Sequence, residues 1–581
     1  MRLTAAQRLA VNHDDNTLVL ACPGSGKTRV LVAKLLRCLD EVRGSARKLA
    51  CITYTNAAVF EIEDRLRRYG TNGDEELCEI STIHSFCLNN ILRHFYWWLP
   101  DYPNGFNVLP PDSETYVEIA NAVIADHHLD QRARDAFPTL NREPDGNPIV
   151  VWPVTRESAL DFWTRLQQEG YVDFPNIVYQ SYRLMDEFPS IACGLACRFP
   201  WLLVDEFQDT SALQIEILDL IASRRKTKFF LVGDPCQSIF GFAGAHPGLM
   251  EEFADRIGAS RDFPLPANFR SSELVIEHAE LLIPREPRMT AEGEWADCTQ
   301  RPRHIHAASA FDAITDHFIP ALDELGIDYG NAGILAPWWV KLLHLGRQLR
   351  DYGIPIIGPG ARPYRRAHLF ALLAEQICEY IEDPNPRLIK RVEKELFNML
   401  NNITGSPNFD VYTYHGRIAV FRLIRAGRAL RLRHDNALAW LIHASEEFAD
   451  ILVEDGLLAD SQRDLLSESV KDMERDMLNN DIDTENLSVT DLGMFASYSK
   501  SMQLLTMHRA KGREFDAVAI IDLHDGRLPH FSANTDDQIE EARRLFYVAI
   551  TRAKRLLMYI TDDEDDSLPT PFLYHGGLDI L

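Results

Sequence analysis

The sequence has 581 residues, of which 46% are hydrophobic and 25% are charged, and its net charge is −26. Such a length predicts several domains, and the composition excludes a disordered or membrane-spanning chain, so we expect a cytoplasmic protein without a signal peptide. The negative charge disfavours nonspecific binding to DNA unless basic side chains cluster locally.

The first predicted element is a short buried strand at residues 18–20, which is followed by a glycine-rich loop and a helix. The loop is Ala21-Cys22-Pro23-Gly24-Ser25-Gly26-Lys27-Thr28, and its Ala21 replaces the first glycine of the usual phosphate-binding pattern. The two glycines allow backbone N–H groups to close on a polyphosphate at the N-terminus of the helix. Lys27 would reach the β- and γ-phosphates, and Thr28 would ligate Mg²⁺. This segment therefore predicts a nucleoside triphosphate site.

An aromatic run and a pair of cysteines come before the next strand. For His94-Phe95-Tyr96-Trp97-Trp98, packing in a core is favoured over a platform for nucleic acid. Cys193 and Cys197 have no histidine or cysteine partner nearby in the sequence. We therefore expect two buried thiols in a reducing compartment and no metal site.

A second acidic motif follows a buried strand predicted at residues 201–204. Asp205 comes directly after this strand, at the end where a carboxylate can hold Mg²⁺. Glu206 is the natural general base for the attacking water. Such an Asp-Glu pair is weak evidence by itself. Because it follows an apolar strand and accompanies the glycine-rich loop, it strongly indicates NTP hydrolysis.

Two further buried strands are predicted at residues 332–336 and 517–521, with a mostly helical segment between them. Six arginines between Gly416 and His434 have roughly helical spacing. A phosphate-facing surface, a solvated face and an anchor for a partner protein all stay open for these arginines. The acidic segment 468–491 is predicted to be solvated and mobile.

The sequence from Asp205 to Thr210, Asp-Glu-Phe-Gln-Asp-Thr, resembles motif II of superfamily 1A helicases, the group of UvrD, Rep and PcrA. With the glycine-rich loop, nine segments resemble the motifs of this family and follow in its order. The other seven are residues 3–11, 52–58, 81–86, 231–242, 268–271, 506–515 and 547–553.

The resemblance implies roles for individual residues. It implies an ATP or dATP cofactor with Mg²⁺, and single-stranded or tailed duplex DNA as the partner. The implied catalytic residues are Lys27, Asp205, Glu206, Gln237, Arg270 and Arg552. The implied nucleotide-binding residues are Gln7, Pro23, Gly24, Ser25, Gly26, Lys27, Thr28, Arg29, Phe269 and Glu514, with Thr28 and Asp205 on the metal. The residues implied to face DNA are Tyr54, Thr55, Asn56, His84, Phe240, Phe242 and His508.

The resemblance also implies an α/β fold with two RecA-like parallel-sheet motor domains, each carrying a mainly helical insertion. Motif spacing predicts motor domain 1A at 1–87 and 200–260, insertion 1B at 88–199, motor domain 2A at 261–370 and 500–581, and insertion 2B at 371–499. With Lys27 in the first motor domain and Arg270 and Arg552 in the second, hydrolysis would be coupled to domain movement.

The implied activity is that of a 3′-to-5′ single-strand DNA translocase and helicase. Two positions depart from the family pattern: Ala57 replaces a lysine and Ala243 replaces an arginine. Both changes remove positive charge near the DNA, which implies a weaker grip on the strand and less processive unwinding by the isolated chain. A DNA-activated NTPase that senses DNA or depletes nucleotides and unwinds little is a second hypothesis. A housekeeping repair helicase also stays open. So does a subunit that resembles the helicase-like subunit of the Gabija anti-phage system and works beside a nuclease-bearing partner. An inactive scaffold is disfavoured, since every expected catalytic side chain is present.

Overall fold

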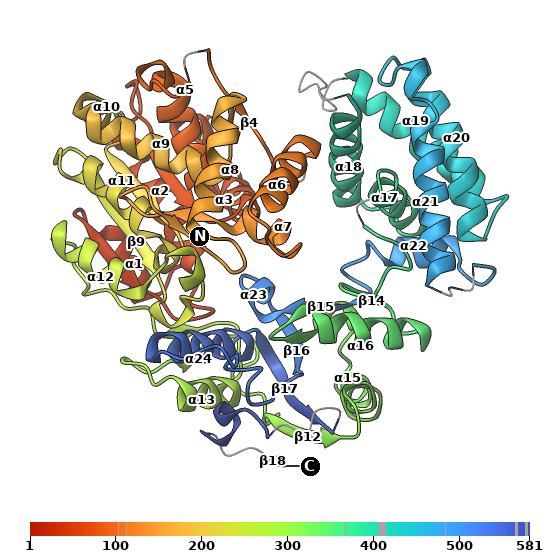
Figure 1. The fold of residues 1–581 in the computed structure, drawn as a ribbon. Coiled ribbons are helices and arrows are strands. Elements are labelled where there is room, and N and C mark those ends of the chain that lie inside the picture. Colours follow the sequence, from red (N-terminus) through yellow and green to blue (C-terminus); the bar gives the residue numbers. More distant parts are fainter. Residues whose placement is uncertain are drawn as a thin grey trace. The chain divides into compact units, whose positions relative to one another are not determined.

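The computed structural model describes residues 1–71, 73–102, 104–111, 113–366, 368–404, 414–480, 482, 484–563, 568–575 and 579–580. Contacts divide the chain into two compact units. The first comprises Met1–Cys298 and Asn534–Thr551, and the second comprises Thr299–Ala533 and Arg552–Leu581. The ribbon of each unit is drawn in Figure 1. In the described part of the chain, no helix is long and apolar enough to cross a membrane.

The first unit is built on a five-stranded sheet in which all neighbouring strands are parallel. Its strands, in spatial order, are β1 (Thr17–Leu20), β9 (Lys228–Gly233), β8 (Trp201–Val204), β2 (Leu49–Thr53) and β3 (Cys78–Thr82). Strands β1 and β8 are the two that the sequence predicts in this half of the chain. The parallel α/β fold class is therefore confirmed for this unit.

Helices cover both faces of this sheet, which explains why its strands are continuous apolar runs. In β9, Phe229 and Leu231 join one core, whereas Phe230 and Val232 join the other, because successive side chains point to opposite faces. The first core receives side chains from α9 (Phe174–Glu187), α10 (Pro189–Arg198), α11 (Ala212–Ala222) and α12 (Pro247–Arg256). The second receives them from α1 (Ala5–Asn12), α2 (Lys27–Cys38) and α3 (Asn56–Tyr69).

The aromatic run predicted to be core is divided between core and surface. Phe95 and Tyr96 pack against the first core, whereas Trp97 and Trp98 are 58% and 40% exposed. The nearby helices α6 (Glu114–Asp126) and α8 (Arg156–Gln168) enclose a separate small core.

Residues 261–298 group with the first unit through the phosphate-binding loop. The N–H of Leu265 donates to the carbonyl of Leu20, and the N–H of Phe269 donates to the carbonyl of Gly24. Helices α13 (Glu273–Leu282) and α24 (Asp536–Ile550) also belong to this unit. The motor-domain boundaries stay a prediction, but by its contacts Arg270 belongs to the same unit as Lys27.

The second unit contains a seven-stranded sheet whose neighbouring strands are again parallel. In spatial order they are β14 (Ile356–Ile357), β15 (Met502–Thr506), β13 (Ala332–Ala336), β16 (Phe515–Ile520), β17 (Ala553–Asp562), β12 (Arg303–Ala307) and β18 (Asp579–Ile580). The predicted strand 332–336 coincides with β13, and the predicted strand 517–521 overlaps β16. Helix α16 (Trp339–Asp351) and α15 (Ile319–Leu325) pack against this sheet.

Helices α17 to α22 form one helical group around a common core (Figure 1). They are α17 (Ala371–Glu382), α18 (Pro386–Thr404), α19 (Tyr414–Arg431), α20 (Ala437–Glu454), α21 (Leu465–Asn479) and α22 (Val489–Met494). The mostly helical character predicted for this segment is confirmed in its described residues. Two of the six arginines in and after α19 form ion pairs with described residues: Arg422 pairs with Glu454 and Asp455, and Arg431 pairs with Glu382 and Asp435. A third, Arg428, lies over the ring of Tyr380.

Two expectations were wrong. The acidic segment was predicted to be mobile, but residues 465–479 form α21, which buries Val470, Met473 and Met477 in the helical core. The helix is stable because its charges lie on the face opposite these side chains. The cysteine pair was predicted to be buried, but Cys197 is exposed and Cys193 is partly exposed.

Candidate nucleotide site and nucleic-acid surface

The phosphate-binding loop connects β1 to α2 and takes a conformation that glycine favours. Gly24 and Gly26 have φ values of 69° and 81°, in the left-handed region. A Cβ at Gly24 would come within 2.7 Å of Arg270 Cβ and of Asn268 Oδ1, so this position also lacks space for a side chain. No side chain caps the N-terminus of α2, which begins at Lys27. The end of this helix therefore presents backbone N–H groups suited to an anion.

Ser25 and Gln7 shape the floor of the loop. The Ser25 hydroxyl is buried and has no hydrogen-bond partner among the described residues, so it is able to donate a hydrogen bond to a phosphate oxygen. Gln7 is 1% exposed; its Nε2 donates to the carbonyl of Ser25 at 2.8 Å, and its Oε1 accepts from the N–H of Thr4 at 3.0 Å. The structure therefore places Gln7 at the loop with both ends of its amide already bonded to the chain.

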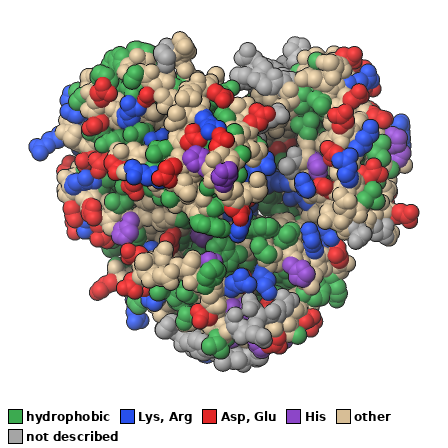
Figure 2. Space-filling model, viewed as in Figure 1, with side chains coloured by type: hydrophobic (Ala, Val, Ile, Leu, Met, Phe, Trp, Pro, Cys, Tyr) green, Lys and Arg blue, Asp and Glu red, His purple; other side chains and the backbone are tan. Residues whose placement is uncertain are grey.

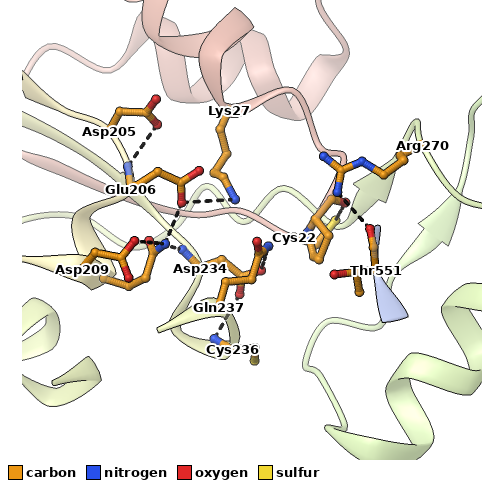
Figure 3. A network of polar contacts seen from close by, with 12 residues as sticks. Cys22, Lys27, Asp205, Glu206, Asp209, Asp234, Cys236, Gln237, Arg270 and Thr551 are labelled. Carbon is orange, nitrogen blue, oxygen red and sulfur yellow. Dashed lines mark hydrogen bonds and ion pairs between the residues drawn. The ribbon is translucent and has the colours of Figure 1, made fainter. Parts of the chain in front are cut away.

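The two acidic residues after β8 lie close to Lys27 (Figure 3). Lys27 Nζ is 3.8 Å from Glu206 Oε2. Asp205 is almost fully buried, and burial raises its pKa to about 7; the charge of Glu206 adds to the rise and Lys27 opposes it. A buried carboxyl of this kind is stabilised as an anion by a nearby cation, which fits a ligand for Mg²⁺. Glu206 has a φ of 48°, an uncommon conformation for glutamate that turns it out of the strand direction.

One buried side chain, Gln208, connects Glu206 to the segment after β9. Its Nε2 donates to Glu206 Oε2 at 2.6 Å, and its Oε1 accepts from the N–H of Asp234 at 2.9 Å. Asp234 in turn accepts from Gln237 Nε2 at 2.7 Å. The structure therefore brings Lys27, Glu206 and Gln237 into one network of hydrogen bonds and an ion pair at the carboxyl ends of adjacent strands.

Arg270 lies on the other side of the loop, where Asn268 holds its backbone. The Asn268 Oδ1 accepts from the N–H of Arg270 at 2.8 Å. Arg270 Nη1 donates to the carbonyl of Thr551 at 3.0 Å, which ties this segment to the end of α24 (Figure 3). Phe269, beside it, is partly buried next to Gly24.

A buried ion pair behind the network was not predicted from the sequence. Arg285 Nη1 lies 2.6 Å from Asp234 Oδ1 and also donates to the hydroxyl of Tyr547 at 3.3 Å. Asp234 is fully buried, and the Arg285 side chain is 10% exposed. Burial lowers the pKa of Arg285, but the charge of Asp234 more than offsets that effect. The pair therefore fixes the carboxylate that holds Gln237.

Three aromatic rings lie in a row on the first unit. Tyr54 and Phe240 are stacked with centroids 5.0 Å apart, and Phe242 lies edge-on to Phe240 at 5.9 Å. Tyr54 is 40% and Phe242 is 47% exposed, so the row presents ring surface to solvent. Thr55 caps the N-terminus of α3, and Asn56 is the exposed first residue of that helix. The row of rings suits the stacking of nucleic-acid bases, and the N-terminus of α3 suits the sugar–phosphate backbone beside them.

His84 lies on α4 (Ile83–Cys87), with its ring against Phe174 at 5.8 Å. Burial lowers the pKa of His84 to about 4, so the ring is neutral near pH 7. Pro23 lies in the phosphate-binding loop directly before Gly24, and Thr28 and Arg29 are the second and third residues of α2.

Three predicted site residues belong to the second unit. His508 lies on α23 (Met507–Ala510), and burial lowers its pKa to about 4, with Lys511 adding to the effect. Glu514 is exposed directly before β16. Arg552 is 2% exposed, and its Nη1 donates to the carbonyl of Arg513 at 3.4 Å.

Two family models match this chain. A family model described as the UvrD/REP helicase N-terminal domain matches residues 3–145 and 150–258. A second, described as the UvrD-like helicase C-terminal domain, matches residues 436–564. Together they cover more than half of the chain.

Similar proteins of known function cover almost its whole length. The chain is 25% identical to ATP-dependent DNA helicase PcrA of Staphylococcus aureus, across 94% of this chain and 80% of that protein. It is 26% identical to DNA helicase II of Salmonella typhimurium, across 96% and 84%. It is 23% identical to ATP-dependent DNA helicase Rep of Buchnera aphidicola, across 96% and 94%.

Proposed function

Because the chain belongs to the UvrD-like DNA helicases of superfamily 1A, and is therefore an ATP-dependent DNA helicase, we propose that it moves 3′ to 5′ along single-stranded DNA. The observation that carries the assignment of its catalytic residues is the network that joins Lys27, Glu206 and Gln237 through Gln208 and Asp234. The direction of movement is supported by the family resemblance alone.

Each side chain of the network has a task in this proposal. Lys27 neutralises charge on the β- and γ-phosphates, and Glu206 accepts the proton of the attacking water. Thr28 and Asp205 are the residues that would hold Mg²⁺, which supplies further charge neutralisation when it is bound. Gln237 senses the γ-phosphate from its bond to Asp234.

Residues outside the network complete the proposed site. Arg270 and Arg552 supply positive charge to the γ-phosphate. The remaining nucleotide contacts are Gln7 and Phe269 at the base, Glu514 at the ribose, and the backbone from Pro23 to Arg29. The nucleotide of this proposal is ATP or dATP.

The DNA strand is proposed to run over the aromatic row of the first unit. Tyr54, Phe240 and Phe242 stack on bases, and stacking contributes about 1–3 kcal/mol per base without regard to sequence. Thr55, Asn56 and the neutral rings of His84 and His508 contribute hydrogen bonds. The predicted boundaries of domains 1A, 1B, 2A and 2B are kept as part of this proposal.

Steady-state ATP hydrolysis with and without single-stranded DNA tests the proposal, together with unwinding of duplexes that carry a 3′ or a 5′ tail. We expect stimulation by DNA and unwinding of the 3′-tailed duplex only. Lys27→Ala and Glu206→Gln should lower kcat at least ~100-fold, since a positioned base contributes about 10²–10⁴-fold. Glu216→Gln on α11 is the matched control, because its carboxylate is also partly exposed but lies outside the network. Hydrolysis retained by a folded Glu206→Gln protein would refute the base assignment.

A second candidate is a DNA-activated NTPase that unwinds little. Ala57 is exposed on α3 next to the aromatic row, and Ala243 follows Phe242 directly. Neither position supplies the positive charge that the family pattern has there, which lowers the expected grip on the strand. Hydrolysis stimulated by DNA without unwinding of either tailed duplex would select this candidate.

We further propose a role in anti-phage defence beside a nuclease-bearing partner. Its support is the resemblance of the chain, with its short 371–499 segment, to the helicase-like subunit of the Gabija system. Affinity purification of the chain from its native host tests this role. Recovery of a nuclease supports it, whereas recovery of repair proteins would favour a housekeeping repair helicase.

A further inference from the structure

Helix α10 carries two cysteines on one face, in a part of the first unit that the proposed catalytic site does not use. Cys193 and Cys197 are neighbours there, because residues four apart in an α-helix lie one turn above each other. All ten cysteines of the chain are free and lie in its described part; Cys197 is exposed and Cys193 is partly exposed. Strand β8 begins after this helix and leads at its other end to Asp205. The two thiols therefore lie at the end of β8 opposite to the proposed catalytic acids.

A lysine places a positive charge beside the exposed sulfur. Lys226 Nζ donates to Cys197 Sγ at 3.2 Å. This hydrogen bond raises the pKa of Lys226, so the side chain keeps its ammonium charge at neutral pH. Lys226 follows α11, which packs against α10 (Figure 1). The thiolate is the nucleophilic form of a cysteine, and a neighbouring cation favours that form, so Cys197 has the surroundings of a reactive thiol.

Backbone contacts fix the positions of the lysine and the cysteine. Thr227, directly after Lys226, is buried, and its hydroxyl donates to the carbonyl of Phe199 at 2.8 Å. The same hydroxyl lies 3.4 Å from the carbonyl of Ala196, the residue before Cys197. Strand β9 begins one residue after Thr227. The two side chains reach solvent, but the sheet holds the backbone segments that carry them.

The turn that carries Lys226 has two further cations, Arg224 and Arg225. Neither forms an ion pair with a described residue, and Arg224 Nε is buried without a hydrogen-bond partner in the described part of the chain. The whole chain has 86 acidic and 60 basic residues, and acidic and basic side chains are interspersed on the face shown in Figure 2. Three consecutive cations are therefore contrary to the charge balance of this protein, and they favour an anionic reactant.

The surface around Cys197 is open and is unsuited to a metal ion. Gly194, three residues earlier on α10, is exposed, and a Cβ there would have no atom within 4 Å. An incoming molecule therefore meets no other side chain at this point of the helix. Among the described residues there is no group of three or more histidine, cysteine or carboxylate side chains that could hold a metal. The ammonium of Lys226 would also repel a cation, so a reaction at the sulfur is favoured over metal binding.

We infer that Cys197 is a modification site at which the chain reacts with small anionic disulfides. In this reaction the Cys197 thiolate attacks one sulfur of the disulfide. A bond forms between Cys197 Sγ and that sulfur, the original S–S bond breaks, and the other half leaves with the electron pair as a thiolate. Cys197 is oxidised and the departing half is reduced, so the disulfide itself is the oxidant.

The expected product is a mixed disulfide and not a bond between Cys193 and Cys197. Residues four apart in a helix have Cβ atoms about 5–6 Å apart, whereas a disulfide needs about 3.5–4.5 Å. Closing that gap would distort α10, whose Ala192, Leu195 and Ala196 are packed in the first core of the unit. The adduct on Cys197 should therefore persist until an external thiol removes it.

Reaction of the full chain with glutathione disulfide, followed by mass spectrometry of the intact protein and of its peptides, tests the inference. Cys298 is the internal control, because it is partly exposed and no lysine contacts its sulfur among the described residues. Lys226→Gln removes the charge beside Cys197, and Lys226→Arg keeps it. Arg134→Gln is the matched control, since it removes an exposed cation of the same unit that forms no ion pair with a described residue. A neutral reagent, 2-hydroxyethyl disulfide, is compared with glutathione disulfide in the parent protein and in Arg224→Gln/Arg225→Gln.

We expect one adduct per chain, at Cys197, formed faster than any adduct at Cys298. A unit charge at the observed 3.2 Å changes the population of a thiolate in water about tenfold, and the lower nucleophilicity of a stabilised thiolate offsets part of this gain. Lys226→Gln should therefore lower the rate constant at Cys197 about 3- to 10-fold. Lys226→Arg and Arg134→Gln should keep the rate constant of the parent protein.

Arg224→Gln/Arg225→Gln should slow the reaction with glutathione disulfide alone, because the neutral reagent has no charge for these cations to attract. Equal rate constants in the parent and Lys226→Gln proteins would overturn the inference, since exposure alone would then explain the labelling. A bond between Cys193 and Cys197 in place of the adduct would also overturn it. Equal slowing of both reagents by the double substitution would refute the preference for an anionic disulfide.

Discussion

Replacing Arg285 by methionine removes the cation that lies against the fully buried carboxylate of Asp234. The substitution keeps most of the side-chain volume, so the main change is the loss of the 2.6 Å ion pair and of the bond to Tyr547. Asp234 would keep its bonds from Gln237 Nε2 and from the N–H of Cys236. Its negative charge would stay buried without a compensating charge.

Removing one partner of a buried ion pair costs about 3–5 kcal/mol. At about 1.4 kcal/mol for each factor of ten, that cost raises the opening equilibrium of the surrounding structure by roughly 10²- to 10⁴-fold. The strand that ends beside Asp234 is β9, the second strand of the five-stranded sheet. We therefore expect the amides of β9 to lose protection by that factor, provided that opening there limits their exchange.

Hydrogen exchange of peptides that cover residues 228–233 is the assay. Arg256→Met is the control, since Arg256 is 43% exposed and lies 3.7–3.9 Å from its carboxylates, a surface contact worth about 0–1 kcal/mol. Asp234→Asn/Arg285→Met should recover much of the protection, because it leaves no unpaired charge. If Arg285→Met protected β9 as well as the control does, the argument that this pair holds the network would be refuted.

Three further predictions concern the aromatic row, the phosphate-binding loop and a buried acid. Phe240→Ala should weaken binding of single-stranded DNA by about 1–3 kcal/mol in an anisotropy titration, whereas Phe60→Ala, an exposed ring outside the row, should change it little. Gly24→Ala should abolish nucleotide binding in a calorimetric titration. Gly44 has a similar φ of 70° and no atom within 4 Å of a new Cβ, so Gly44→Ala should cost only about 1 kcal/mol of stability. An equal loss of nucleotide binding in the two variants would contradict the steric argument. Burial raises the pKa of Glu379 from 4.5 to about 7, so the folded state holds a proton that the unfolded state has lost, and stability should fall as pH rises between those values. Denaturant unfolding at pH 5 and pH 8 measures this loss of stability, which is up to about 3 kcal/mol for the parent protein. Glu379→Gln should remove the difference between the two pH values, and an unchanged difference would show that Glu379 is not its source.

The parts of the fold that the sequence predicted are those with a local pattern. Strands β1, β8, β13 and β16 were visible because a parallel sheet covered on both faces needs an uninterrupted apolar run. The glycine-rich loop was visible because its conformation restricts the residue type at Gly24. These features depend on neighbouring residues, so a single sequence contains enough information to find them.

The acidic helix α21 had a signal that was overlooked. Leu466, Val470, Met473 and Met477 recur at intervals of three and four residues, which is the period of a helix with one buried face. The acidic residues between them made the segment resemble a solvated one. Charge density alone was therefore a poor guide where the apolar spacing was regular.

The connections within the candidate site could not be predicted. Gln208 and Asp234 are 26 residues apart, and Arg285 is 51 residues beyond Asp234, so their contacts depend on how the chain folds back. The family resemblance supplied roles for Lys27 and Glu206, and those roles stay predictions. The side chains that hold such residues in place, such as Gln208 and Arg285, do not occur at a characteristic spacing in the sequence that would have identified them.

The two ends of the Gln208 amide belong to one rigid plane, with consequences for communication within the first unit. Its nitrogen is committed to Glu206 and its oxygen to the backbone of Asp234, six residues before Phe240. A shift of the Asp234 turn must break one bond or rotate the plane, and either event alters the hydrogen bond that Glu206 accepts. Thermodynamic coupling between two sites is reciprocal. A DNA strand that moves Phe240 would change the affinity for a nucleotide at Glu206, and the nucleotide would change the affinity for the strand by the same factor, through the single side chain of Gln208.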